Sequence, residues 1–326
     1  MKKTLWLLLD DRRGSVGQAL GIAEAVGNQM TIEHKNIVYN VFGGVPNWIR
    51  GRSLLGVDIN KSDDIQKDFP DIVLSTSRRT VAVARYIRKK SGYKTKIVQL
   101  MYPSGGVGIK DMEFYVIPSH DAEKKKKHPK AFVINGAPTR IFIEKLHDEK
   151  EKWNKVFANL PKPWTAVILG GAIKNNPWAE ESVKRLADNL KNLHKKIGGS
   201  FLITSSRRTG KQNENLIFDA IKGIPCYTYL WGEKKENPIM GFYVCSDLIV
   251  ATADSVSMCS EACGTGTPVL LFKDETWLTG KHQRFATSLI TNGYAQDIET
   301  QNALDFRPEK TLNPANEIAE KILEIC

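Results

Sequence analysis

The sequence predicts an α/β protein built from two doubly wound domains that face each other across a cleft. Short apolar runs alternate with amphipathic helical segments along the chain, which is the pattern of parallel sheets covered by helices. A charged helical stretch that stops at Pro161 and Pro163 interrupts this alternation, and 326 residues exceed the usual size of one core. We expect an N-terminal domain at 1–142, a connecting helix and linker at 143–163, a C-terminal domain at 164–300, and a segment with a last helix at 301–326 that can pack back on the first domain.

The first half contains six segments that read as strands, and the first of them, Thr4–Leu9, is a continuous apolar run, as expected of a strand buried on both faces. A helix is predicted at Gln18–Val26, where apolar residues recur at helical spacing, and another after residue 80, with Val81, Ala84 and Ile87 facing inward. The predicted strands are Thr4–Leu9, Thr31–Val38, Asp71–Ser75, Lys96–Leu100, Phe114–Ile117 and the short run at Val133 and Ile134.

Polar residues follow several of these strands, at the edge where parallel sheets bind ligands. Asp11 and Arg12 follow the first strand, and Ser77 and Arg78 follow the third, where they resemble an anion cradle. His120 follows the fifth strand and can act as a base near neutral pH. We therefore expect Asp11 or His120 to be the catalytic base, with capping by Asp11 and a surface position for His120 as the alternatives.

Residues 41–57 have no clean period and interleave large apolar side chains, such as Phe42 and Trp48, with Arg50 and Arg52. An apolar segment with arginines fits peripheral contact with a membrane. Core packing by an irregular loop and helix is the alternative.

The second half repeats the alternation of strands and helices. Gly170 and Gly171 follow its first strand and allow a ligand to approach the backbone closely, and Ser206 and Arg207 repeat the serine–arginine pair of the first half. The predicted strands are Ala166–Leu169, Ser200–Thr204, Cys226–Leu230, Leu248–Val250 and Val269–Phe272, and the predicted helices are Pro177–Leu193, Asn213–Ile221 and a last one within 313–326.

The stretch 251–272 reads as one strand–helix–strand unit and is the strongest candidate for a binding site. Ser255 and Ser257 can cap the helix, and Glu261 lies within its first turns, close enough to accept two hydroxyls. A phosphate at the helix N-terminus and a diol on a carboxylate would make a nucleotide site, whereas capping and a solvated glutamate are the alternative. The predicted nucleotide-binding residues are Gly170, Gly171, Ser206, Arg207, Ser255, Ser257, Met258 and Glu261.

The positive charge lies almost entirely in the first half. Residues 1–150 hold 26 Lys and Arg against 16 Asp and Glu, and residues 151–326 hold 21 against 20. The first half therefore favours an anionic partner. Nucleic acid is not expected, because no aromatic platform is interleaved with the basic residues. The apolar run Leu5–Leu9 is too short for a signal peptide or a span, so we expect a cytoplasmic protein that can contact the inner membrane peripherally.

Two successive domains of this kind, with a Ser/Glu/Gly-containing unit late in the second, resemble the Rossmann-like pair of the GT-B glycosyltransferases. In that fold the second domain binds a nucleotide-sugar donor, a carboxylate holds the ribose, and the first domain faces the acceptor. Glu261 matches that carboxylate, and Gly264, Gly266 and Pro268 match the turn that follows it.

A second resemblance covers nearly the whole chain, in the same order, and is to the mitochondrial-fission (elongated-mitochondria) family. It implies either a nucleotide-sugar enzyme, because some members carry an epimerase label, or an adaptor, because plant members act in organelle division. The motifs that carry it are DDRRGSVGQALGIAEAVG, PSHDA at 118–122, VILGGAIKN at 167–175, LITSSRRTG at 202–210, NPIMGFYVCSDLIVATADSVSMCSEACGTGTPVLLF at 237–272 and KHQRFATSLITNGYA at 281–295.

These observations lead to the hypothesis of a GT-B-like glycosyltransferase that uses a nucleotide sugar and acts on an anionic or lipid-linked acceptor, in cell-envelope glycan synthesis. Arg12, Ser77 and Arg78 would bind the acceptor, and no cofactor is expected besides the donor substrate. No metal is expected, because the sequence has no DxD pair or His cluster. The alternatives are a membrane-associated adaptor without turnover and a nucleotide-sugar epimerase.

Overall fold

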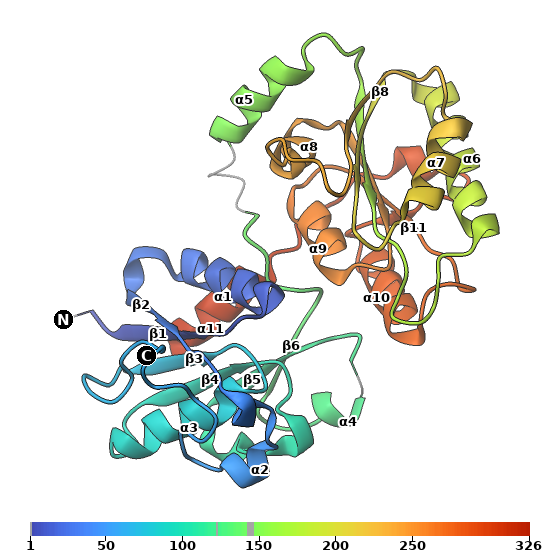
Figure 1. Ribbon diagram of the computed structural model, residues 1–326. Helices are drawn as coiled ribbons and strands as arrows, with labels where there is room; N and C mark the ends of the chain where they lie inside the picture. The colour runs from blue at the N-terminus through green and yellow to red at the C-terminus, as the bar shows by residue number, and fades with distance from the viewer. Residues whose placement is uncertain (1, 122, 142–146) are drawn as a thin grey trace. The chain divides into compact units, whose positions relative to one another are not determined.

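The computed structural model describes residues 2–121, 123–141 and 147–326. The chain forms two compact units (Figure 1). Unit 1 contains the residues up to Arg140 together with Asn313–Cys326, and unit 2 contains Ile141–Leu312. Each unit has one six-stranded sheet whose paired strands are all parallel, so the predicted α/β class with two doubly wound domains is confirmed.

The sheet of unit 1 has the strand order β2-β1-β3-β4-β5-β6. Because β1 lies between β2 and β3, the direction of winding changes at β1 and β3, which is where such sheets bind ligands at their carboxyl edge. Strands β1 and β3 consist almost wholly of buried residues, as expected for central strands. The strands are β1 Thr4–Leu9, β2 Thr31–Asn36, β3 Ile72–Ser75, β4 Lys96–Leu100, β5 Phe114–Pro118 and β6 Ala131–Ile134.

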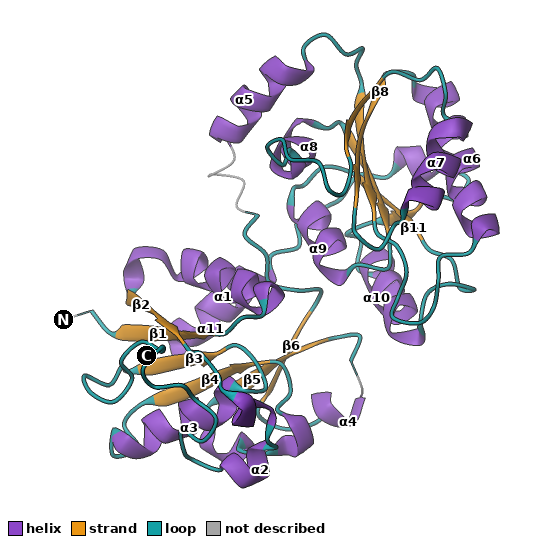
Figure 2. Ribbon diagram, in the orientation of Figure 1, coloured by secondary structure: helices purple, strands orange, loops and turns teal. Residues whose placement is uncertain are grey.

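Helices cover both faces of this sheet (Figure 2). Helix α1 (Arg13–Val26) packs beside α11 (Pro314–Glu324) on one face, so the last helix belongs to unit 1. Asn313 caps α11 by accepting a hydrogen bond from the Asn316 N–H at 3.2 Å. The other face carries α2 (Asn47–Arg50), α3 (Thr80–Lys90) and α4 (Glu123–Lys126).

The sheet of unit 2 has the order β12-β11-β10-β7-β8-β9. Its winding changes direction at β7 and β10, which are neighbours, so the carboxyl ends of these two strands mark the expected ligand edge. The strands are β7 Trp164–Leu169, β8 Ser200–Ser205, β9 Cys226–Tyr229, β10 Leu248–Thr252, β11 Val269–Phe272 and β12 Gln296–Asp297.

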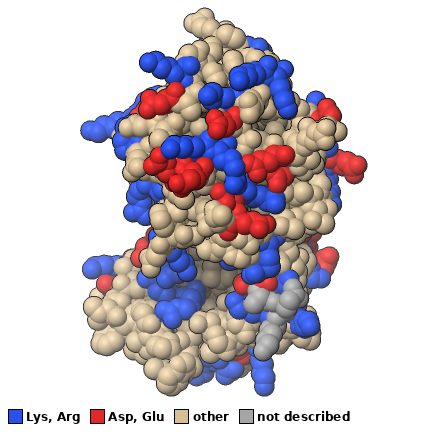
Figure 3. Space-filling model, turned by 90° about the vertical axis from the view of Figure 1, so that its right-hand side faces the viewer, with Lys and Arg blue, Asp and Glu red and all other residues tan. Residues whose placement is uncertain are grey.

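Helices α6 (Glu180–Ile197) and α7 (Lys211–Ala220) cover one face of this sheet, and α8 (Ile239–Cys245) and α9 (Val256–Gly264) cover the other (Figure 2). Helix α10 (Gly280–Thr291) joins β11 to β12. On the face of unit 2 with α6 and α7, basic and acidic side chains are interspersed, as the near-zero charge of this half requires (Figure 3).

Helix α5 (His147–Phe157), which the sequence places in the connection, packs inside unit 2 against α8. Its Trp153 and Phe157 are buried in the core of this unit. A Cβ at Gly241 of α8 would lie 2.2 Å from the Trp153 ring, so the two helices approach closely only because this residue is a glycine. The burial of its apolar face explains why α5 belongs to the domain and not to a linker.

Candidate functional site

The same four-residue turn, Ser-Arg-Arg-Thr, follows β3 in unit 1 and β8 in unit 2. In both turns the N–H of the serine donates to the threonine Oγ1 over 2.9 Å, from Ser77 to Thr80 and from Ser206 to Thr209. The serine Oγ accepts from the N–H of the second arginine, at 3.1 Å in unit 1 and 3.2 Å in unit 2. Local bonds from hydroxyl side chains therefore fix the backbone of both turns in the same way.

The second arginine of each turn holds a buried aspartate that follows another strand of the sheet. Arg79 Nη2 lies 3.1 Å from Asp10 Oδ2 in unit 1, and Arg208 Nη2 lies 2.8 Å from Asp254 Oδ2 in unit 2. Both aspartate side chains are completely buried. The sequence drew attention to the first arginine, whereas the geometry makes the second one part of the sheet edge.

Asp254 joins the ends of three strands. Its Oδ2 accepts from the Gly171 N–H at 3.0 Å, and its Oδ1 accepts from Thr252 Oγ1 at 2.7 Å. Burial raises the pKa of Asp254, and the charge of Arg208 and these hydrogen bonds oppose that rise. The carboxylate thus fixes Arg208 in place relative to the ends of β7 and β10.

Gly170 and Gly171 leave room for this junction. A Cβ at Gly170 would lie 1.9 Å from Asp254 Oδ1, and a Cβ at Gly171 would lie 2.1 Å from the carbonyl carbon of Arg208. The space beside these glycines is therefore occupied by the Asp254 side chain and by the backbone of Arg208. A role for their backbone in binding a ligand remains a proposal.

Helix α9 begins at the same edge. Ser255 is its N-cap and accepts from the Met258 N–H at 3.5 Å, while Ser257 is exposed and Met258 packs against the core. Glu261 is half-buried, and Oε2 of its carboxylate accepts a hydrogen bond of 3.1 Å from the hydroxyl of Tyr243. Burial raises the pKa of Glu261, and the bond from Tyr243 opposes that rise. Glu261 is therefore a held carboxylate and not a freely solvated one.

His282, in the first turn of α10, is a site residue that sequence reasoning did not single out. It is half-buried, and its Nδ1 lies 2.7 Å from Thr279 Oγ1. Its pKa is lowered, first by burial and then by the positive charges of Lys281, Arg208 and Lys174. These cations come from the turns after β7 and β8 and from the first turn of α10, and only the basic motif at 281–284 signals this in the sequence.

In unit 1 the two candidate bases differ in access. Asp11 is 76% exposed and pairs with Arg79, whereas His120 is only 2% exposed. Arg12 is exposed, but Ser77 is buried and its hydroxyl belongs to the turn. Asp11 is therefore the candidate that an acceptor can reach directly.

Two buried polar atoms at this edge find no hydrogen-bond partner within the described parts of the chain: Gln99 Oε1 and Arg79 Nε. Gln99 lies near the end of β4, and its Nε2 donates to the Leu100 carbonyl at 2.7 Å. Buried polar atoms are nearly always paired, so these two atoms have hydrogen-bonding capacity that the described residues leave unused.

Residues 41–57 place large apolar side chains on the surface of unit 1. Val41 is 90% and Trp48 is 72% exposed, so the alternative of core packing is wrong for these two residues. The arginines of the segment are used internally instead, because Arg50 is buried and donates to the Arg79 carbonyl at 2.7 Å, and Arg52 pairs with Asp111 at 2.8 Å. We call the exposed side chains Val41, Phe42, Trp48, Ile49, Leu55 and Ile59 the apolar patch.

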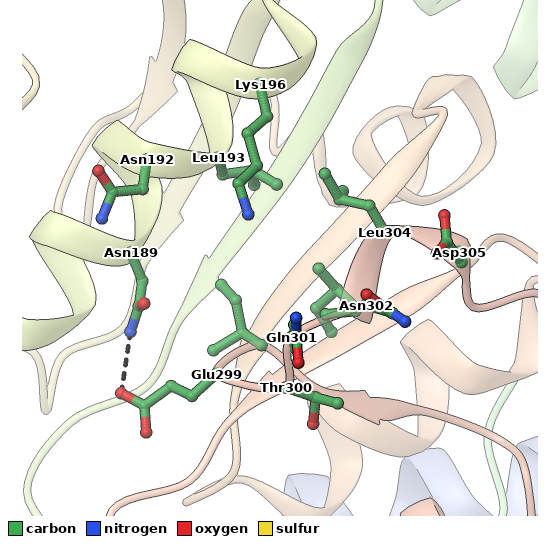
Figure 4. A pocket seen from close by; sticks show the side chains of 13 residues that line it. Asn189, Asn192, Leu193, Lys196, Glu299, Thr300, Gln301, Asn302, Leu304 and Asp305 are labelled. Atoms are coloured by element: carbon green, nitrogen blue, oxygen red, sulfur yellow. Dashed lines mark hydrogen bonds between the residues drawn. The ribbon is translucent and has the colours of Figure 1, made fainter.

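A separate hollow of about 620 Å³ lies between α6 and the segment after β12 (Figure 4). Lys196 extends into it from α6, and Asn189 donates to Glu299 Oε1 at 3.0 Å on its wall. None of the predicted site residues lines this hollow. It is therefore distinct from the edge formed by β7, β8 and β10.

Of the helices in the described ranges, none combines the length and apolar character that crossing a membrane requires.

Bacterial and plant proteins are similar to the chain in sequence. Uncharacterized protein RP120 of Rickettsia prowazekii is 27% identical over 98% of this chain and 97% of the relative. Mitochondrial fission protein ELM1 of Arabidopsis thaliana is 31% identical over 63% of this chain, which spans about half (52%) of the plant protein. The UDP-N-acetylglucosamine–N-acetylmuramyl-(pentapeptide) pyrophosphoryl-undecaprenol N-acetylglucosamine transferase of Alkaliphilus oremlandii is 24% identical over 78% of this chain and 68% of its own length.

Several solved structures have a similar fold. The UDP-GlcNAc 2-epimerase of Methanocaldococcus jannaschii matches with a TM-score of 0.61 at 14% identity, covering 99% of both chains. The UDP-GlcNAc 2-epimerase of Neisseria meningitidis, solved with UDP-GlcNAc, matches with a TM-score of 0.53 at 15% identity over 98% of both chains. MurG of Acinetobacter baumannii matches with a TM-score of 0.51 at 14% identity over 98% of this chain and 99% of that one.

These matches establish the GT-B fold that the sequence predicts. The model of one family, described as mitochondrial fission ELM1, matches residues 13–325, and the chain belongs to that family.

Proposed function

We propose that this protein is a nucleotide-sugar-dependent glycosyltransferase with its donor site at the carboxyl edge of the unit 2 sheet. The observation that carries the proposal is the joining of β7, β8 and β10 by Asp254 and Arg208, beside a held carboxylate at Glu261. Open α/β sheets bind ligands where the winding changes direction, and this edge combines cations for phosphates with an acceptor for hydroxyls. Neighbours of the same fold act on or were solved with UDP sugars, which supports the choice of donor class.

In the proposed site, Glu261 accepts hydrogen bonds from the two ribose hydroxyls. Ser255, Ser257 and Met258 lie at the start of α9, and Gly170, Gly171, Ser206 and Arg207 lie at the ends of β7 and β8. Cationic side chains neutralise the diphosphate, so that the scheme needs no metal ion.

The acceptor would bind at the carboxyl edge of unit 1. Its hydroxyl attacks the anomeric carbon, the bond from that carbon to the phosphate oxygen breaks, and the base takes the hydroxyl proton as the nucleoside diphosphate leaves. Asp11 is the base that we favour because it is exposed, with His120 as the second candidate. Arg12 and Arg78 would attract an anionic group.

The apolar patch favours a lipid-linked acceptor at a membrane surface. Its segment is fixed to the anion-binding turn, because Asn47 Nδ2 donates to the Arg78 carbonyl at 2.8 Å and Arg50 donates to the Arg79 carbonyl. An apolar surface next to basic groups suits an anionic lipid, because the apolar surface can contact the tail and the basic groups can bind the phosphate. We therefore propose a cytoplasmic protein that contacts the inner face of a membrane.

The test is a donor screen. Purified protein is incubated with nucleotide sugars, with and without lipid-linked acceptors, and released nucleoside diphosphate is measured. We expect release that depends on the acceptor and is lost in Asp11→Asn. No release from any donor, by protein that nonetheless binds the donor and floats with vesicles, would contradict catalysis.

Two observations support other functions of the same fold. The UDP-GlcNAc 2-epimerase of Methanocaldococcus jannaschii matches the chain with a TM-score of 0.61. An epimerase activity of this protein would convert the donor without any acceptor. The relationship to the plant fission protein, together with the apolar patch, supports an adaptor without turnover. Sugar analysis of the same reactions separates these functions: an epimerised donor indicates the first, and vesicle binding without turnover indicates the second.

A further inference from the structure

The edge of unit 2 concentrates cations in a half of the chain that is otherwise nearly neutral. Lys174 follows β7, Arg208 follows β8, and Lys281 begins α10 after β11. The turns that carry Lys174 and Arg208 adjoin the segment that leads into α10, because Arg208 Nη1 donates to the Ala172 carbonyl at 3.0 Å and Asn176 Nδ2 donates to the Trp277 carbonyl at 2.5 Å. The charges of the three cations, after burial, lower the pKa of His282. The three cations lie far apart in the sequence, so the fold brings them to one edge.

The position of Arg208 is fixed, while part of it remains open. Its Nη1 donates to the Ala172 carbonyl at 3.0 Å and its Nη2 contacts the buried Asp254 at 2.8 Å, yet 36% of the side chain is exposed. An arginine oriented by a buried carboxylate presents its remaining donors without loss of side-chain entropy when an anion binds.

Lys174 has an unusual backbone. Its φ is +53°, and the turn is closed by paired bonds of 2.9 and 2.8 Å between Ile173 and Asn176. Lysine rarely adopts this left-handed conformation, and such residues cluster at functional sites. Its side chain is exposed and has no ion-pair partner in the described structure.

We propose that Lys174, Arg208 and Lys281 form a cradle for the diphosphate of the donor, and that His282 takes up a proton when the diphosphate binds. The inference rests on the proposed function and adds the phosphate-binding residues to it. The two phosphate charges offset most of the repulsion from the three cations, so protonation of His282 becomes more favourable. The protonated ring would then stabilise the additional negative charge that the leaving nucleoside diphosphate acquires when the glycosidic bond breaks.

The sign of the pH dependence follows from the groups around His282, which are Lys281, Arg208, Lys174 and the hydroxyl of Thr279. In the free protein, burial and these charges lower the pKa of His282 and keep the ring neutral. Bound phosphates raise that pKa, so the affinity for the donor falls as the pH rises between the free and bound pKa values. The diphosphate of a nucleotide sugar does not itself titrate near neutral pH, so the proton is taken up by the protein.

Calorimetric titration of the full chain with UDP-GlcNAc, in two buffers of different ionisation enthalpy, measures this proton uptake. We expect uptake by the parent and none by His282→Gln, whose amide can keep a hydrogen bond to Thr279. Arg208→Ala should weaken binding roughly 10- to 100-fold, the scale of a hydrogen bond to a charged group. Lys174→Asn should also weaken binding, and asparagine preserves the left-handed turn because it tolerates this conformation. Uridine should bind all variants equally.

Lys195→Ala, an exposed lysine on α6, is the matched control and should bind like the parent. If the Lys174 and Arg208 variants bind UDP-GlcNAc like the parent while Glu261→Ala does not, the cradle is wrong and the donor site stands. If His282→Gln binds weakly but takes up protons as the parent does, the role of His282 is wrong. If the folded parent binds no nucleotide sugar at all, both the cradle and the proposed function fail.

Discussion

At the scale of single residues, the candidate site depends on two carboxylates that sit in unlike surroundings. Asp254 is buried and pairs with Arg208, so it serves the structure of the edge. Glu261 is half-buried and receives one bond from Tyr243, so it retains acceptor capacity for a ligand. We therefore propose that Asp254 positions Arg208 and that Glu261 binds the ligand.

Tyr243→Phe tests the link between Tyr243 and Glu261. The hydroxyl lowers the pKa of Glu261, so its removal raises that pKa and the carboxylate takes a proton at a higher pH. As the pH is lowered, nucleotide-sugar binding should therefore be lost at a higher pH in the variant than in the parent. Titrations at a series of pH values measure this, and an unchanged midpoint would show that the carboxylate of Glu261 does not bind the ligand. The loss of this hydrogen bond should also lower the free energy of unfolding by about 1 kcal/mol.

Some residues of the candidate site stand out in the sequence, and others do not. Ser255 and Glu261 stand out because a capping residue and a carboxylate follow a strand of clear apolar character. Arg208 does not, because Arg207 and Arg208 are neighbours in a turn, and only the bond from the Arg208 N–H to Ser206 Oγ decides which one faces Asp254. No periodic pattern encodes that choice.

At the scale of elements, central strands such as β1 and β11 match their predicted bounds, because a strand buried on both faces must be a run of apolar residues. Strand β12 went unpredicted, since it consists of two half-buried polar residues at the edge of the sheet. The sequence predicts that helix α5 belongs to the connection, because charged residues dominate its composition. In the structure, Trp153 and Phe157 bury its other face in unit 2.

The junction of β7, β8 and β10 predicts a difference between two glycines. Gly171→Ala should lower the free energy of unfolding by about 1–3 kcal/mol, because its Cβ would overlap backbone atoms of Arg208. Gly17→Ala, in α1, should be neutral or stabilising by about 0.5–1 kcal/mol, because its Cβ meets nothing within 4 Å. Chemical denaturation of both variants compares them. Equal stability would mean that the strand ends are not packed as described.

At the scale of the whole molecule, two units of one fold carry different charge and different surfaces. Both units carry the Ser-Arg-Arg-Thr turn, but among the described residues it is the turn of unit 1 that is bonded to the segment of the apolar patch. This difference supports a donor in unit 2 and an amphipathic, anionic acceptor in unit 1.

Trp48→Ser tests the membrane part of this account. Trp48 is exposed, so the variant should keep its stability within about 0.5 kcal/mol. Flotation with vesicles that contain anionic lipid should nevertheless decrease, and the binding of the parent should weaken as salt is added. Val156→Ser replaces an exposed apolar residue of unit 2 and is the control. Equal flotation of the parent and Trp48→Ser would remove the apolar patch from the account.

The central claim is that unit 2 binds a nucleotide sugar through Glu261, and calorimetric titration of UDP-GlcNAc and related donors into the parent and Glu261→Ala tests it most directly. We predict saturable binding by the parent and a loss of about 1.5–3 kcal/mol in the variant, the scale of hydrogen bonds to a charged group. A folded Glu261→Ala that binds every nucleotide sugar as tightly as the parent would contradict the claim.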